Sequence, residues 1–163
     1  MSTKMSLTPS ADQVGKALGI IIPIRAQDTG LVPEGWGVRK DRLEGRVELA
    51  KLNYLSGCFV KAPEIYVSGE IMTKRALELG AIGSLGLAAG LLEAQKKGKI
   101  IFPVESGVKK HNFVMPCTEL DDEGGDASVA YFYWNRCGGG WKLGLRSLVG
   151  YFYPRDRFLR FSD

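Results

Sequence analysis

The stretch YFYWNRCGGGWKLGLR, residues 131–146, is the clearest structural signal in the C-terminal half of the chain. Before the glycines, Tyr131 and Tyr133 fall on one face of an extended strand and Phe132 and Trp134 on the other, because successive strand side chains alternate. After the glycines, apolar residues alternate with basic residues or glycine. Two such runs around a glycine-rich turn are typical of a β-hairpin.

The return strand predicts which side of this hairpin meets water. Trp141 lies on its apolar face, and Lys142 and Arg146 lie on the opposite, basic face. An antiparallel sheet with one polar face is half-solvated. The three glycines are followed by a strand and not by a helix that starts with Lys-Ser or Lys-Thr, so they form a turn and not a Walker-type phosphate loop.

Further strands are predicted around the hairpin. Segments 99–104 and 109–120 read as two strands joined by a Glu-Ser-Gly turn, and three more strands are predicted at 127–135, 141–149 and 150–161. The second half of the chain is therefore predicted to be a β-meander.

The first half of the chain has mixed patterns. Residues 1–8 are predicted to be a loose arm, followed by a short helix over 11–18 and a strand over 19–24. The segment 40–55 fits both a helical and a strand period, and we favour a strand that begins near Arg46.

A long helix is predicted from Thr73 to Lys97. Glycines inside a helix are destabilising, so their recurrence predicts close approach of a sheet or another helix; they are Gly80, Gly83, Gly86 and Gly90. Their spacing and their place inside a helix do not match a dinucleotide-binding loop. The sequence as a whole therefore predicts one α+β domain over 1–163, in which a single long Gly-striped helix covers an antiparallel sheet.

Composition indicates an ordinary folded domain in a reducing compartment. The chain has 163 residues, of which 45% are hydrophobic, enough to bury a core. Three cysteines do not make a disulfide framework, and the N-terminal residues lack the apolar run of a secretory signal, so we predict a cytoplasmic protein. The longest apolar run, 81–92, is shorter than the roughly 20 residues of a membrane-spanning helix, which predicts no membrane span.

Charge is concentrated at the C-terminal end. The chain carries a net charge of +4, and residues 131–161 hold six basic residues against Asp156 alone. The segment 119–126 just before them is acidic. An acidic segment next to a basic one suits head-to-tail contacts between copies of the chain.

A basic, aromatic sheet is therefore the predicted binding site. Its residues are Tyr131, Tyr133, Arg136, Trp141, Lys142, Arg146, Arg155, Arg157 and Arg160. We predict a non-enzymatic binding or assembly protein that associates with itself or with a protein partner through this sheet. Because aromatic rings between basic residues also stack nucleobases and neutralise phosphates, a nucleic-acid-binding protein is one alternative.

A cysteine hydrolase is the other alternative. His111 is the only histidine, so any Cys–His mechanism must use it, and Cys58 is the better nucleophile because Cys117 lies too far along the same strand. No cysteine or histidine spacing matches a zinc site, and the acidic segment lacks the alternating oxygens of a calcium loop. No metal and no cofactor are predicted.

Overall fold

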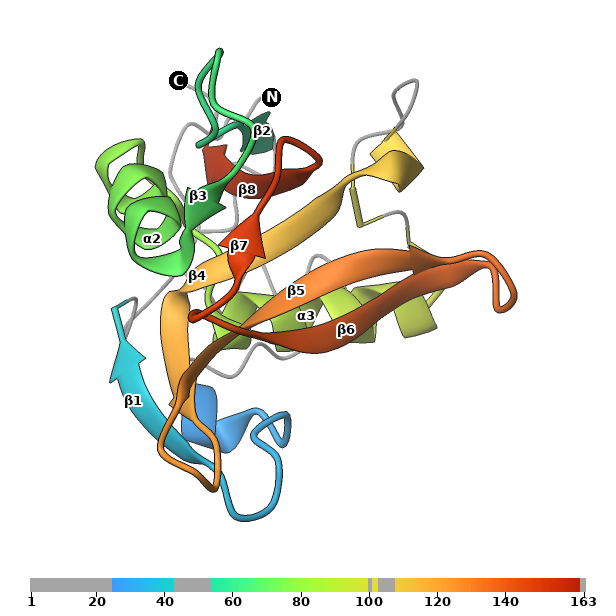
Figure 1. The fold of residues 1–163 in the computed structure, drawn as a ribbon. Helices are drawn as coiled ribbons and strands as arrows, with labels where there is room; N and C mark the ends of the chain where they lie inside the picture. Colours follow the sequence, from blue (N-terminus) through green and yellow to red (C-terminus); the bar gives the residue numbers. More distant parts are fainter. Residues whose placement is uncertain (1–24, 43–53, 100, 103–107, 162–163) are drawn as a thin grey trace, which may run out of the picture.

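A computed structural model of the chain describes residues 25–42, 54–99, 101–102 and 108–161. Most strands join one six-stranded sheet in the order β2-β8-β4-β5-β6, with β1 on the free part of β4, and β3 and β7 form a separate two-stranded ribbon (Figure 1). The strands are β1 (Gly37–Asp41), β2 (Tyr54–Gly57), β3 (Val67–Ser68), β4 (Asn112–Asp121), β5 (Ala127–Asn135), β6 (Gly140–Ser147), β7 (Tyr151–Phe152) and β8 (Asp156–Phe161). The helices are α2 (Gly69–Glu78) and α3 (Leu85–Lys96), with 3₁₀ turns η1 (Ala26–Asp28) and η3 (Val108–Lys110).

Strand β4 is the centre of the sheet. One of its edges pairs with β5 in antiparallel fashion, while the other edge is shared between two partners. Its first residues, Asn112 to Val114, pair with β8 in parallel, and its last residues, Thr118 to Asp121, pair with β1 in antiparallel fashion. The eight residues from Phe113 to Leu120 are all buried, and all of them except Thr118 and Glu119 are apolar.

The predicted hairpin at 131–146 is confirmed as β5 and β6. Tyr131 faces Gly144 and Tyr133 faces Lys142 across the pair. Gly139 at the tip has φ of +66°, a left-handed conformation that glycine adopts without steric cost. The glycines therefore serve the turn.

The long helix predicted from Thr73 to Lys97 is wrong, because two helices occupy this region. Gly80 has φ of +86° and ends α2. The chain then runs beside β8, where Ile82 N–H donates to the Leu159 carbonyl at 2.9 Å. The Ser84 hydroxyl accepts from Leu87 N–H and begins α3 as its N-cap.

One glycine of the predicted stripe does mark a close approach. A Cβ on Gly83 would lie 3.1 Å from Met115 Cα and 3.2 Å from the Val114 carbonyl oxygen. Gly83 therefore lets the connection between the two helices pass directly over β4.

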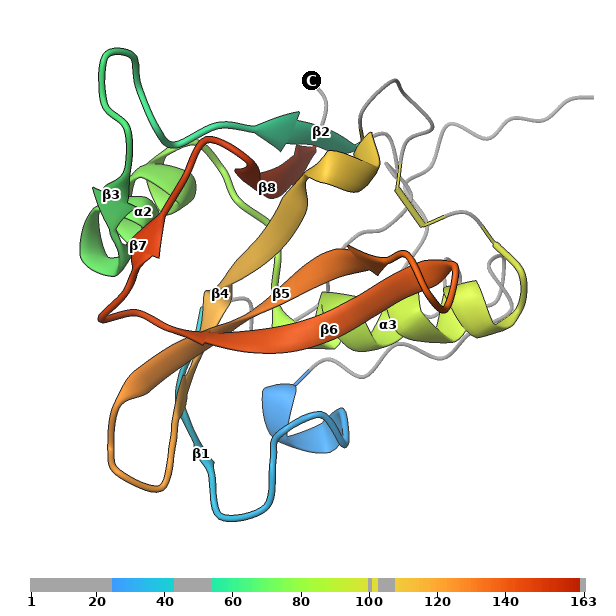
Figure 2. The ribbon, with the colours of Figure 1, turned by 45° about the vertical axis from the view of Figure 1, so that its right-hand side comes forward.

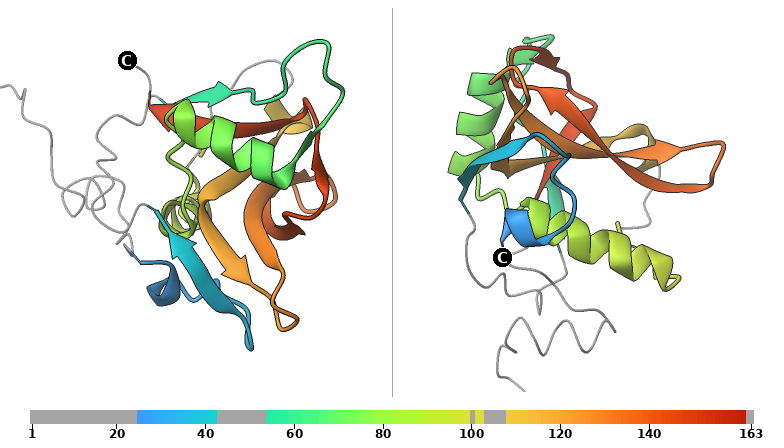
Figure 3. Two further views of the ribbon diagram at one scale, coloured as in Figure 1. Left: turned by 60° about the vertical axis from the view of Figure 1, so that its left-hand side comes forward. Right: turned by 90° about the horizontal axis from the view of Figure 1, so that it is seen from below.

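The two helices cover separate parts of the sheet, and each part has its own apolar cluster (Figures 2 and 3). Helix α3 packs beneath the β5–β6 hairpin, where Leu87, Ala88 and Leu91 join a cluster with Phe113 and Phe132. Helix α2 packs beside β4 and the β3–β7 ribbon. There Met72 and Ala76 join a second cluster that includes three fully buried phenylalanines, Phe59, Phe152 and Phe158. An α+β architecture is therefore confirmed.

The remaining predictions differ in outcome. The last predicted strand, 150–161, is interrupted at Pro154, so its first part pairs with β3 and its second part with β2 and β4. Residues 99, 101 and 102 do not form the strand predicted at 99–104. The predictions at 1–8, 11–18 and 19–24, and most of the strand predicted from Arg46, lie outside the described residues. Neither described helix is long enough and apolar enough to span a bilayer.

Candidate binding surface

One face of the β5–β6 hairpin points away from α3 and carries four of the predicted site residues; we call it the hairpin face, and it comprises Tyr131, Tyr133, Lys142 and Arg146. Their strand register places them on the same side. The two tyrosine rings lie 5.7 Å apart. Tyr133 is 36% exposed and Lys142 is exposed, so an aromatic ring and an ammonium group are presented to solvent side by side. Among the residues predicted for the binding site, Tyr133 and Lys142 are therefore exposed together on this face.

Arg146 is part of this face, but its charge is used within the chain. Its guanidinium lies 4.6 Å from the ring centre of Tyr131 and 5.0 Å from that of Phe152. It donates to the Asp156 carboxylate at 2.8 Å. Arg146 therefore fixes the position of the tyrosine instead of offering a free cation.

Asp156 is fully buried and is held by three donors. Besides Arg146, the Asn112 side-chain amide donates to it at 3.0 Å and Tyr153 N–H donates at 2.8 Å. A buried carboxylate is stable only when it is paired and hydrogen-bonded in this way. Asp156 thus joins the β7–β8 turn to the start of β4 and to β6.

Trp141 lies on the other face of the hairpin and is 7% exposed. Its ring packs edge-on against Phe102 at 4.7 Å and against Trp134 at 5.5 Å. Its backbone N–H and carbonyl both bond to the Gln95 side chain, each at 2.8 Å. Trp141 is therefore a core residue under the hairpin and is not part of the hairpin face.

The other predicted arginines do not gather on the hairpin face. Arg136 is exposed at the tip of the hairpin, whereas Arg155 and Arg157 flank Asp156, in the turn before β8 and in its first residues. Arg157 donates its Nε to the Pro154 carbonyl. Arg160 lies on β8 opposite Leu55. The basic segment of the sequence is thus divided in space.

A second group of exposed tyrosines lies on the β3–β7 ribbon; we call Tyr66, Tyr151 and Tyr153 the tyrosine cluster. The Tyr66 ring is 4.5 Å from that of Tyr151 and 6.2 Å from that of Tyr153. The three are 40% to 54% exposed. Sequence analysis missed Tyr66, because only the pairing of β3 with β7 brings it to Tyr151 and Tyr153.

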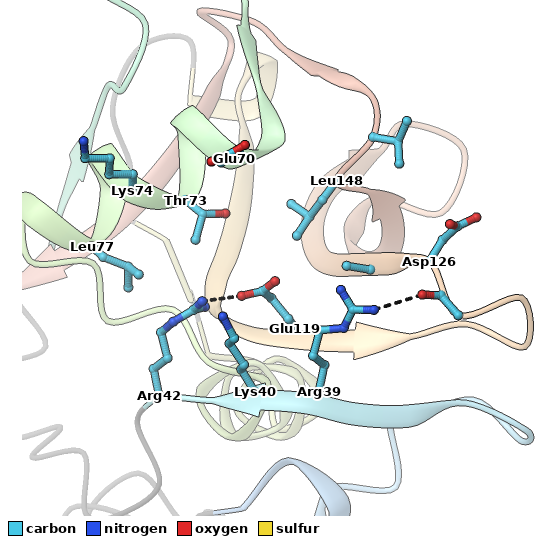
Figure 4. Close-up of a pocket in the computed structure, with 13 residues that line it drawn as sticks. Arg39, Lys40, Arg42, Glu70, Thr73, Lys74, Leu77, Glu119, Asp126 and Leu148 are labelled. Carbon is cyan, nitrogen blue, oxygen red and sulfur yellow. Dashed lines mark hydrogen bonds and ion pairs between the residues drawn. The ribbon is translucent and has the colours of Figure 1, made fainter.

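A pocket of about 540 Å³ lies between β1, α2 and the β4–β5 turn (Figure 4). A bulge in β1 lets Arg39 and Lys40 stand opposite a single stretch of β4. Arg42 pairs with Glu119, and Arg39 pairs with Asp121 at 2.6 Å and donates to the Gly125 carbonyl. Two carboxylates of the acidic segment are therefore paired with Arg39 of β1 and with Arg42, which follows β1, and this weakens the hypothesis of a head-to-tail contact through that segment.

Cys58 and His111 lie on opposite sides of β8. Gly57 and Val114 both pair with Phe158, so the strands that carry them are separated by two strand spacings, about 10 Å. The Cys58 thiol donates to the Val60 carbonyl at 3.3 Å. No hydrogen bond between Cys58 and His111 is found in the described part of the chain, so the hydrolase alternative has no assembled pair.

Within the described ranges, no group of three or more His, Cys, Asp or Glu side chains is placed to hold a metal ion. No protein-family model matches the sequence, and comparisons with curated proteins and with solved structures give no significant match. The functional interpretation therefore depends on the surface itself.

Proposed function

We propose that this chain is a non-enzymatic binding module that associates with a protein, either a partner or another copy of itself, through the hairpin face. The observation that supports this most directly is the exposed Tyr133 beside Lys142, on a sheet that α3 packs against. Tyrosine is enriched in protein interfaces because it combines a large apolar area with a polar group. The tyrosine cluster adds a second exposed aromatic area.

The structure favours a protein partner over a nucleic acid. Nucleic-acid affinity depends on the number of phosphates that free cations neutralise. Arg146 is committed to Asp156, and the other arginines of the basic segment belong to the hairpin tip, the turn before β8 and β8 itself, not to the hairpin face. Lys142 is then the one uncommitted cation among the four residues of this face.

Photo-crosslinking from position 133 tests the proposal. A photoreactive phenylalanine analogue replaces Tyr133 in the full chain, and the same analogue replaces Glu34, which is exposed on the loop before β1. Irradiation in the native cells is expected to give a discrete adduct from position 133 and none from position 34. Light scattering of the purified chain then shows whether the partner is a second copy.

Two results would overturn the proposal. One is a monomer at all accessible concentrations that gives no adduct from position 133. The other is tight binding of a generic oligonucleotide with affinity that falls steeply with salt, which would assign the face to nucleic acid.

A further inference from the structure

Strand β6 lies at the end of the sheet order and has β5 as its single strand partner among the described residues. Its pairing with β5 determines which backbone groups point outward. Leu148 N–H donates to the Ala127 carbonyl, and the N–H and carbonyl of Trp141 bond to the Gln95 side chain. Because groups on an antiparallel strand alternate in direction, Trp141, Leu143 and Leu145 direct their N–H and carbonyl groups away from β5.

The outward N–H and carbonyl of Trp141 are hydrogen-bonded, whereas those of Leu143 and Leu145 have no partner among the described residues. Gln95 from α3 covers Trp141 with two hydrogen bonds. In the described part of the chain, no hydrogen bond uses the outward N–H or carbonyl of Leu143 or Leu145. Both residues are half-buried, and among the described residues no strand pairs with this edge of β6.

We propose that this edge of β6 binds an extended acidic segment of a protein partner by adding it to the sheet as a further strand. This inference rests on the proposed function and names the class of partner. Main-chain hydrogen bonds to Leu143 and Leu145 hold the added strand, and side chains next to β6 select it.

The charges on β6 determine which segment fits. On the hairpin face, an added strand places alternate side chains beside Lys142 and Arg146. Acidic side chains are complementary to Lys142 there. On the other face of the sheet, the added strand places its remaining side chains beside Leu143 and Leu145, so apolar side chains fit there. The preferred partner therefore alternates acidic and apolar residues.

In the register centred on Gly144, the same charges disfavour a second copy of the chain on this edge. A symmetric pairing of two β6 strands centred on Gly144 would place Lys142 of each copy beside Arg146 of the other. Like charges directly opposite each other destabilise a strand pair. Lysine on an edge strand is a common protection against such self-pairing.

Gly144 brings an aromatic ring toward the same edge. A Cβ on Gly144 would lie 2.9 Å from Cε1 and Cζ of the Tyr131 ring and 3.0 Å from its hydroxyl oxygen. The phenol therefore lies across β6 where another residue would have a side chain. An added strand would meet this ring between its contacts with Lys142 and Arg146.

Two capped eight-residue peptides test the proposal, one alternating Glu and Val and the other alternating Lys and Val. Amide hydrogen exchange of the full chain by NMR is the readout. In the free protein the Leu143 and Leu145 amides are expected to exchange faster than those of Lys142 and Gly144. The Glu-Val peptide is expected to protect them and to bind at least about tenfold more tightly than the Lys-Val peptide, a difference of roughly 1.4 kcal/mol.

Two variants make the test specific. Leu145→Pro removes an outward N–H that has no partner in the free chain, so it is expected to abolish peptide binding while β5 and β6 stay paired. Lys142→Glu keeps every backbone group and is expected to reverse the preference between the peptides. It is the decisive variant if Leu145→Pro fails to fold.

Four results would overturn the inference. They are slow exchange at Leu143 and Leu145 in the free protein, equal binding of both peptides, binding of neither, and a dimer that protects these amides. If an adduct still forms from position 133, the proposed function survives while the assignment of the β6 edge fails.

Discussion

The guanidinium of Arg146 donates to the carboxylate of Asp156 at 2.8 Å, and Asp156 is completely buried. This pair connects the edge of the sheet to the β7–β8 turn. Arg146 also stacks on Tyr131, so the same contact orients the hairpin face. One ion pair therefore supports both the core of the domain and its candidate binding surface.

Removal of Arg146 is expected to destabilise the protein strongly. Arg146→Met leaves the buried Asp156 carboxylate without its charged partner, which costs about 3–5 kcal/mol of unfolding free energy. Urea unfolding measures this change. Arg155→Met is the matched control, because Arg155 is exposed, and it is expected to change stability by less than about 0.5 kcal/mol. Equal stability of the two variants would show that the Arg146 pair is not important for folding.

Removal of Glu64 is expected to make the protein less stable in a pH-dependent way. Hydrogen bonds from Arg75, at 2.6 and 3.0 Å, and from Lys61 N–H lower the pKa of Glu64 from 4.5 to about 2. A lowered folded-state pKa favours folding above pH 4.5, and this contribution is lost as the pH falls toward 2.

Glu64→Gln should therefore be less stable than the parent at pH 6, and the difference should disappear near pH 2. Thermal unfolding across this range measures the difference. In an Arg75→Met background the Glu64→Gln change should have a much smaller pH dependence. A pH-independent difference between parent and Glu64→Gln would contradict the assignment.

Alternation within one strand was enough to predict the hairpin, because it depends only on local sequence. The same alternation places Trp141 and Lys142 on opposite faces of β6, and this was the sequence signal that Trp141 belongs to the core. In contrast, the break between α2 and α3 has local signals in Gly80 and in the Ser84 N-cap, but the bond from Ile82 to β8 joins segments that are distant in sequence. The tyrosine cluster depends on the pairing of β3 with β7, and no local pattern indicates that contact.

The role of Arg146 had a weaker signal in the sequence. Asp156 is the single acidic residue among the basic residues of 131–161, and an isolated acid in an aromatic strand suggests an internal partner. The sequence could not show which of the six basic residues pairs with Asp156, because the β7–β8 turn determines which of them lies near its carboxylate.

A methyl group at position 83 is expected to disturb the packing of β4. Gly83→Ala would place its Cβ 3.1 Å from Met115 Cα and 3.2 Å from the Val114 carbonyl oxygen, and backbone atoms do not move away easily. We expect a loss of about 1–3 kcal/mol in unfolding free energy. Gly37→Ala is the control, since nothing lies within 4 Å of a Cβ there, and it should be close to neutral. A neutral Gly83→Ala would show that the connection between the helices shifts freely.

Substitutions at positions 133 and 141 are expected to separate binding from stability. Tyr133→Ser changes an exposed residue, so unfolding free energy should change by less than about 0.5 kcal/mol while adduct formation from a crosslinker at the neighbouring Lys142 decreases. Trp141→Ala removes a buried ring and should cost about 3–5 kcal/mol. Denaturation and crosslinking of the same samples give both values. A destabilising Tyr133→Ser would instead place Tyr133 among the structural residues.

The three cysteines are expected to differ in their reactivity toward alkylating reagents. Cys137 is exposed at the hairpin tip, whereas Cys117 is fully buried and donates its thiol to the Ala81 carbonyl at 3.2 Å. Burial raises the pKa of Cys117 to about 12, so at pH 8 a fraction on the order of one in ten thousand is thiolate, the reactive form. Iodoacetamide at pH 8, followed by peptide mass spectrometry, should modify Cys137 first and leave Cys117 unmodified until the protein unfolds.

Cys58, which is half-buried and bonded to the Val60 carbonyl, should react more slowly than Cys137. Faster modification of Cys58 than of Cys137 would indicate that the Cys58 thiol is activated, and it would support the alternative of a Cys58–His111 hydrolase.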